Sequence, residues 1–293
     1  MQRLLLLFIL CFSLTIYARK PKKSVPPKEN IIQADFIETA LGVDMKFRWV
    51  EAGAFVMGCG EDDADAYQDE KIERNITLDG FYIGIFEVTQ AQWEKVMGTS
   101  IYQQQAKVKY SSTYGVGPDY PMYYVSWDEA VEFCKRLSKA SGKSYSLPTE
   151  AQWEYAARGQ QGYKYAGSDN VKTVAWYNEN SGEQTHPCGT KRANGFGIYD
   201  MSGNVWEWCK DRYNKEYILS DHESDYHNPT TPEGWEPPSG YARVNRGGSW
   251  DYSANFCRVT CRSGDLRDYR ADIGFRVVLV QEKTVLPARF LNP

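Results

Sequence analysis

Three stretches in the first half of the chain place apolar residues at the spacing of an amphipathic helix. They begin near Thr89, after Ser126 and after Thr149. The hydroxyls of Ser126 and Thr149 can each accept a backbone N–H of a first helical turn. Gly142 and Gly159 follow these two stretches, and glycine is the preferred residue just beyond a helix end. The pattern therefore predicts three helices.

Two apolar runs in the same half of the chain predict β-strands, at 46–57 and 78–88. The residues between them, 60–75, are acidic and polar and predict a loop. A second loop is predicted at 99–120, where Gln, Ser, Tyr and Gly predominate.

Beyond residue 160 the pattern becomes irregular. Gly, Asn, Asp, Ser and Pro recur every few residues among short aromatic runs. This pattern predicts short strands and ordered loops, with a last strand at 273–280. Loops of this kind need aromatic side chains packed beneath them. The candidates are Trp176, Trp206, Trp208, Trp235 and Trp250.

The N-terminus has the pattern of an export signal. An apolar run follows Arg3 and ends at Ala18, so residues 1–18 read as a cleaved signal peptide. The run is too short to predict a transmembrane span. A lipid anchor at Cys11 is the alternative. Residues 19–44 follow as a basic, Pro-rich tether, and the location is predicted as cell surface, periplasmic or secreted.

Composition limits the kinds of partner. The net charge is −4 and no basic stripe occurs, which argues against a nucleic-acid ligand. Six cysteines remain after residue 18, and their irregular spacing fits buried thiols with one or two disulfides of undetermined connectivity. We expect a monomer.

Several sequence blocks together resemble the formylglycine-generating-enzyme, or sulfatase-modifying-factor, family. The resemblance implies an α+β fold of the C-type-lectin type, rich in loops, with few helices and short antiparallel strands. The domain would span 45–281, followed by a tail at 282–293. The blocks are AGAFVMG (52–58), FEVTQAQW (86–93), YPMYYVSWDEAVEFC (120–134), LPTEAQWEYAARG (147–159), NGFGIYDMSGNVWEWC (194–209), NRGGSW (245–250) and IGFRVV (273–278).

The family's oxidase binds copper(I) through two cysteines separated by four residues, just after the GGS block. Here the second position matches Cys257, but the first falls on Tyr252. A phenol cannot replace a soft thiolate ligand, and Cys261 lies on the wrong side of Cys257 to restore the pair. The family's non-haem iron branch needs histidine ligands, and the chain has only His186, His222 and His227. We therefore predict no catalytic residues and no required cofactor.

The resemblance also implies a calcium site in the block DMSGNVWE (200–207). Its ligands would be the side chains of Asp200 and Glu207 and the backbone carbonyls of Gly203 and Val205. Hard oxygen donors with two carboxylates suit Ca²⁺. The alternative is that the two carboxylates only brace a turn.

The segment 251–272, DYSANFCRVTCRSGDLRDYRAD, contains no Lys, Glu, Gln, Met or Trp. AAY codons mutated at their adenines never encode these five residue types. The segment therefore resembles the part of C-type-lectin-fold variable proteins, including treponemal ones, that diversity-generating retroelements rewrite. A chance bias in a loop is the alternative.

Recognition chemistry also suits this segment, because aromatic residues among Asp, Ser and Asn are typical of paratopes. We predict a non-catalytic surface protein that binds a protein or glycan ligand. The alternatives are the copper-dependent oxidase and a structural envelope protein. Residues Cys257, Val259, Ile273 and Phe275 should be buried. The predicted ligand-binding residues, expected to be exposed, are Asp251, Tyr252, Ser253, Asn255, Phe256, Cys261, Ser263, Asp265, Leu266, Asp268, Tyr269, Ala271 and Asp272.

Overall fold

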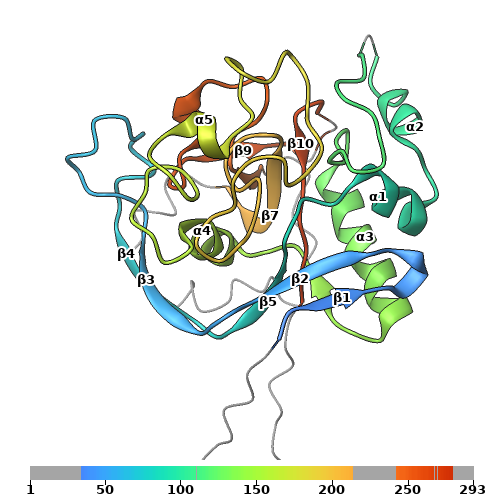
Figure 1. Cartoon of the computed structure of the whole chain (residues 1–293), viewed down its shortest axis with the longest axis horizontal. Helices are drawn as coiled ribbons and strands as arrows, with labels where there is room; N and C mark the ends of the chain where they lie inside the picture. Colours follow the sequence, from blue (N-terminus) through green and yellow to red (C-terminus); the bar gives the residue numbers. More distant parts are fainter. Residues whose placement is uncertain (1–33, 110, 214–241, 267, 269, 280–293) are drawn as a thin grey trace, which may run out of the picture. The chain divides into compact units, whose positions relative to one another are not determined.

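Two β-sheets and a long hairpin organise the domain (Figure 1). The computed structural model describes residues 34–109, 111–213, 242–266, 268 and 270–279. The signal peptide, Cys11, most of the tether, His222, His227, Trp235, Arg267, Tyr269 and the tail at 282–293 lie outside these residues.

The larger sheet has five strands, and the last of them in sequence, β11, lies between β5 and β6. The pairs β1–β2, β2–β5, β5–β11 and β11–β6 are all antiparallel. In spatial order the strands are β1 (Phe36–Glu38), β2 (Met45–Val50), β5 (Phe81–Gly84), β11 (Val278–Leu279) and β6 (Tyr145–Ser146).

The second sheet carries the segment of interest at its edge. Its strand order is β10 (Ile273–Gly274), β7 (Trp206–Arg212), β8 (Arg243–Arg246) and β9 (Arg262–Asp265). The β10–β7 pair is parallel and the other two pairs are antiparallel. A separate hairpin, β3 (Gly53–Met57) with β4 (Arg74–Leu78), contacts helix α4.

The three predicted helices form, and each has a capping box at its start. They are α1 (Gln90–Met97), α3 (Trp127–Ser141) and α4 (Glu150–Arg158). Left-handed glycines follow all three. Two short helices were not predicted, α2 (Ile101–Gln105) and α5 (Val171–Val174). For α2 the signal was present, since Ser100 and Gln103 form another capping box.

Two strand predictions and the predicted extent of the tether need correction. The run 46–57 is broken at residues 51–52 into β2 and β3, which belong to different sheets. The run 273–280 is likewise divided, because β10 pairs with β7 whereas β11 pairs with β5 and β6. The tether is shorter than 19–44, since β1 and the 3-10 helix η1 (Ala40–Gly42) lie within that range.

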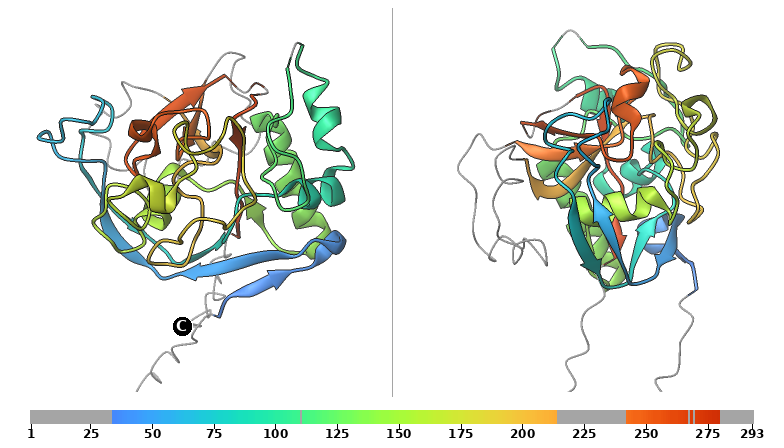
Figure 2. Two further views of the ribbon diagram at one scale, coloured as in Figure 1. Left: turned by 45° about the horizontal axis from the view of Figure 1, so that its top comes forward. Right: turned by 90° about the vertical axis from the view of Figure 1, so that its left-hand side faces the viewer.

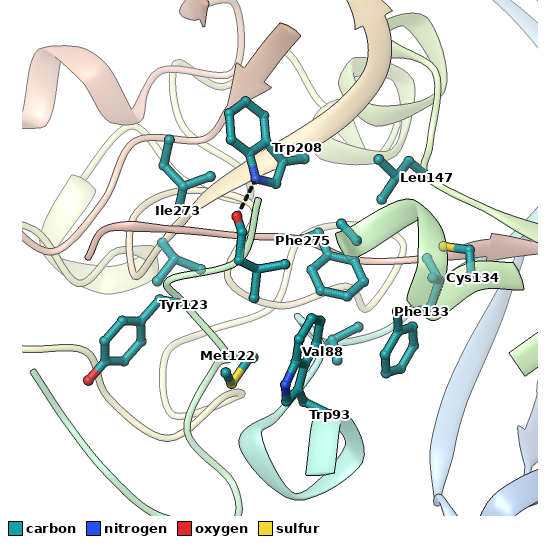
Figure 3. Packing of buried hydrophobic residues seen from close by; sticks show 14 of the residues in the cluster. Val88, Trp93, Met122, Tyr123, Phe133, Cys134, Leu147, Trp208, Ile273 and Phe275 are labelled. Carbon is teal, nitrogen blue, oxygen red and sulfur yellow. Dashed lines mark hydrogen bonds between the residues drawn. The ribbon is translucent and has the colours of Figure 1, made fainter. Parts of the chain in front are cut away.

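Aromatic rings fill the core between α1, α3 and β10 (Figure 3). Trp93 stacks on Phe133, and Phe275 meets both rings edge-on. The indole N–H of Trp208 donates to the carbonyl of Val125 at 2.9 Å, so this buried polar group is satisfied. Among the described residues, no helix has both the length and the apolar character needed to cross a membrane.

Candidate functional site

The segment 251–265 leaves the end of β8 through two glycines. Gly247 and Gly248 have φ values of 99° and 74°, a region that glycine enters without steric penalty. A Cβ on Gly248 would lie 2.9 Å from the sulfur of Cys257 and from the carbonyl of Phe256. The chain then forms the 3-10 helix η4 (Ala254–Cys257) and returns along β8 as β9. The GGS block thus sets the path of the segment.

Hydrogen bonds and ion pairs of buried arginines fix the path of this segment. Arg246 is fully buried, donates to the carbonyls of Thr260 and Cys261, and pairs with Glu154. Arg262 makes a two-point contact with Glu150, at 2.8 and 2.7 Å. Such planar two-point pairs fix geometry as well as charge.

A third arginine ties the segment to the loop 59–73. Arg258 makes a two-point contact with the buried carboxylate of Glu70, at 2.5 and 2.7 Å. Thr260 donates to the same carboxylate at 2.7 Å. The loop therefore lies beside the segment, as the two orientations in Figures 1 and 2 show. Arg258, Arg262, Arg270 and Arg276 all form ion pairs.

The predicted division into buried and exposed side chains holds for the described residues of this segment with two exceptions. Cys257, Val259, Ile273 and Phe275 are at most 2% exposed. The exposure expected of Cys261 and Asp272 is wrong: they are 0% and 7% exposed. Cys261 packs into the main core, and Asp272 is covered beside Arg270. The positions that are at least partly exposed are Asp251, Tyr252, Ser253, Asn255, Phe256, Ser263, Asp265, Leu266, Asp268 and Ala271.

A row of aromatic side chains runs along this face. Tyr252 and Phe256 meet edge-to-face with centroids 5.0 Å apart, and both stand edge-on to Trp206, which is buried. Tyr67 of the loop continues the row, 5.9 Å from Phe256. Sequence reasoning missed Tyr67, because nothing in its local pattern links it to residues so distant in the chain.

The charged groups at the other end of the row form a small network. Arg270 lies 3.3 Å from Asp265 and 3.4 Å from Asp272. Burial raises the pKa of both carboxyls, and Arg270 opposes that rise. Burial also raises the pKa of Tyr252, and the neighbouring Asp272 adds to the effect. The phenol is therefore a neutral hydrogen-bonding group at physiological pH.

The two positions that correspond to the family's copper-binding cysteines hold Tyr252 and Cys257. All six cysteines of the described residues are free. Burial raises the pKa of Cys257 and raises that of Cys261 to about 12, so both remain thiols. A turn lies between them, closed by a hydrogen bond from the Cys261 N–H to the Arg258 carbonyl at 3.1 Å. With Tyr252 at the first ligand position, these residues do not fit a Cu(I) bis-thiolate.

A second cluster of titratable groups lies in the interior. Glu207 makes a two-point contact with Arg276, both distances 2.6 Å, and accepts the indole N–H of Trp153 at 2.7 Å. Asp200 accepts the backbone N–H of Gly189 at 2.7 Å. Gly203 and Asn204, with φ of 79° and 64°, form the turn between the two carboxylates. The predicted calcium ligands Asp200, Gly203, Val205 and Glu207 thus belong to one buried turn.

Two further groups complete this cluster, and sequence reasoning missed both. Glu87 accepts the side-chain amide of Asn204 at 2.6 Å, and the Cys188 thiol donates to it at 3.4 Å. Ligand atoms of Glu87, Cys188 and Asp200 lie within 4.8 Å of one another. Burial, with Asp200 and Glu207 nearby, raises the pKa of Glu87, and burial raises that of Asp200 to about 6. The sequence signal that could have identified Glu87 is the position of an acidic residue inside the apolar block FEVT (86–89).

Comparison with known proteins gives consistent results. Residues 41–281 match the sulfatase-modifying factor enzyme 1-like domain. The chaperone protein LppX of Paenibacillus barcinonensis is 32% identical, over 78% of this chain and 87% of that protein. The formylglycine-generating enzyme of Bos taurus is 29% identical, over 78% of this chain and 72% of that protein.

Solved structures show the same relationship. Treponema denticola variable protein 1 is similar with a TM-score of 0.69 and 28% identity, covering 84% of this chain and 99% of that one. PvdO from Pseudomonas aeruginosa gives 0.67 and 25%, covering 84% and 97%. The predicted resemblance and the predicted α+β, C-type-lectin-like fold are confirmed.

Proposed function

The chain belongs to the family of sulfatase-modifying factor enzyme 1-like domains, and we propose that it uses this fold for binding without catalysis. The ligand would contact the partly exposed side chains of the face 251–272. The observation that carries this proposal is the separation between a buried, arginine-held frame and a partly exposed aromatic row on the same segment.

Two further observations support the proposal. A fold tolerates extensive substitution only where side chains do not fill the core, and ten of the predicted ligand-binding positions are at least partly exposed. The structural similarity to a variable protein points in the same direction. The protein would be exported by its N-terminal segment and displayed at the cell surface or in the envelope.

Formylglycine-generating activity is the competing function, because that enzyme in other organisms is 29–35% identical to this chain. We expect the purified protein, supplied with copper(I) and oxygen, to leave the cysteine of a sulfatase peptide unchanged. The reason is that Tyr252 stands where one of the two thiolate ligands would be needed, and a phenol cannot replace a soft thiolate. Mass spectrometry of the peptide provides the measurement. Formylglycine that forms with the wild type and disappears with Cys257→Ser would establish the oxidase instead.

We also propose that the turn 200–207 holds a structural calcium ion. The donor chemistry fits, because the buried carboxylates of Asp200, Glu207 and Glu87 exceed the single positive charge of Arg276. Asp200 and Glu207 would hold the ion with the carbonyls of Gly203 and Val205.

The calcium proposal predicts a melting temperature that falls when EDTA is added and recovers with excess Ca²⁺. Asp200→Asn, which keeps the shape but removes one charge, should melt at the same temperature with and without the chelator. Asp119→Asn serves as the matched control and should respond like the wild type. Elemental analysis that finds no calcium, together with no response of the wild type to EDTA, would contradict the proposal.

A further inference from the structure

The loop 59–73 is fixed against the face 251–272 by one buried carboxylate. Glu70 is 2% exposed and accepts from Arg258, from Thr260 and from the backbone N–H of Tyr67, the last at 3.0 Å. The same group therefore orients both the segment and the ring that extends the aromatic row.

Additional contacts hold the loop on both sides of Tyr67. The side-chain amide of Asn255 donates to the carbonyl of Asp65 at 3.3 Å, and Lys164 pairs with the Asp65 carboxylate at 2.5 Å. The Tyr213 hydroxyl donates to Asp69 at 2.8 Å. Because Asp65 and Asp69 are both held, Tyr67 has a defined position although 44% of its surface is exposed.

Tyr67, Phe256 and Tyr252 thus make one continuous aromatic surface contributed by two distant parts of the chain. Among the described residues of these two segments, the exposed charged side chains are acidic. Asp251 and Asp268 are exposed on the segment, and Glu61, Asp62 and Glu73 are exposed on the loop. The charge of Arg270 on this face is already shared between Asp265 and Asp272.

We propose that the binding face extends onto the loop 59–73 through Tyr67, and that its ligand is a basic polypeptide segment. This inference rests on the proposed binding function and assigns the ligand class. Arginine and lysine side chains gain energy over aromatic faces, and surrounding carboxylates favour a cationic partner and speed its association. A neutral glycan would use the aromatic rings but gain nothing from the carboxylates.

A peptide library tests the proposal with the full domain. Random dodecapeptides on phage are selected against the wild type after removal of those that bind Tyr252→Ala/Phe256→Ala. The peptides that remain depend on the face, and their affinities for single variants are then measured by fluorescence anisotropy. We expect them to be enriched in arginine and lysine and to bind more weakly as salt is raised.

The decisive variant is Tyr67→Ala, which should weaken binding about tenfold. Tyr67→Phe should bind like the wild type, because the ring face is retained. The matched control is Tyr102→Ala, since Tyr102 is 59% exposed on α2, far from the loop in Figure 1. Asp251→Asn should also weaken binding, whereas Glu94→Gln, at an exposed site on α1, should not.

The outcomes separate this inference from the proposed function. Face-dependent peptides that are neutral or acidic, or that bind Tyr67→Ala as well as wild type, overturn the inference and leave the binding function standing. If the face binds an arrayed glycan but no peptide, the inference is likewise overturned and the binding function stands. A selection that yields no peptide dependent on Tyr252 and Phe256, with no glycan bound, contradicts both.

Discussion

Replacing Arg276 by methionine should lower the free energy of unfolding by about 3–5 kcal/mol, the usual cost of leaving buried charges without their partner. Arg276 is fully buried and is the cation facing Glu207, with Glu87 and Asp200 close by. For a domain of this size the melting temperature should fall on the order of 10 °C. Calorimetry or circular dichroism provides the measurement.

The effect should depend on pH in a definite direction. The pKa values of Glu87 and Asp200 are already raised in the folded state. Carboxylates with raised folded-state pKa values bind protons that the unfolded chain releases, so the fold gains stability as pH falls through that range. Without Arg276 the pKa values of Glu87 and Asp200 rise further. The loss in free energy of unfolding caused by Arg276→Met should therefore be smaller at about pH 5 than at about pH 7.

Arg136→Met is the matched control for this substitution. Arg136 pairs with Glu132 on the exposed surface of α3, with both side chains about half exposed. Such pairs contribute roughly 0–1 kcal/mol. Equal melting temperatures for Arg276→Met and Arg136→Met would show that the buried cluster does not stabilise the fold.

Local sequence signals predicted the parts of the fold that local physics determines. Hydroxyl caps and terminal glycines located α3 and α4, because those groups satisfy the unpaired backbone donors and acceptors of helix ends. The helical spacing of apolar residues located α1. The family blocks indicated the fold as a whole. The periodicity of the apolar residues could not show that the run 273–280 serves two sheets, since both of its strands are buried.

The candidate site was predictable in part for a similar reason. Composition marked the segment 251–272, and the fixed residues Cys257 and Val259 are buried as expected. Tyr67 and Glu70 were not identifiable, because the ion pair that brings them to the face joins residues separated by 188 positions. Cys261 was misassigned because the composition of the segment does not show that this side chain packs into the main core.

Substitutions on the face should change the stability of the fold little, whereas substitutions in the core directly behind it should lower the stability strongly. Changes at exposed positions usually alter stability within about 0.5 kcal/mol, and the partial packing of Tyr252 and Phe256 adds a modest cost. Truncation of one core side chain costs about 2–5 kcal/mol. Two or three such truncations would therefore remove most of a typical free energy of unfolding of about 5–15 kcal/mol.

The most direct test of binding through a variable face on a fixed frame is a pair of matched display libraries of the whole domain. One randomises Tyr252, Phe256, Ser263 and Leu266, and the other randomises Cys257, Val259, Ile273 and Phe275. Each is sorted for protease resistance and then for binding to hen lysozyme as a basic probe protein. We predict that the first library keeps broad diversity and yields lysozyme binders, while the second returns only the original residues or close apolar replacements. Collapse of both libraries to the original residues would show that the segment is core and would contradict the account.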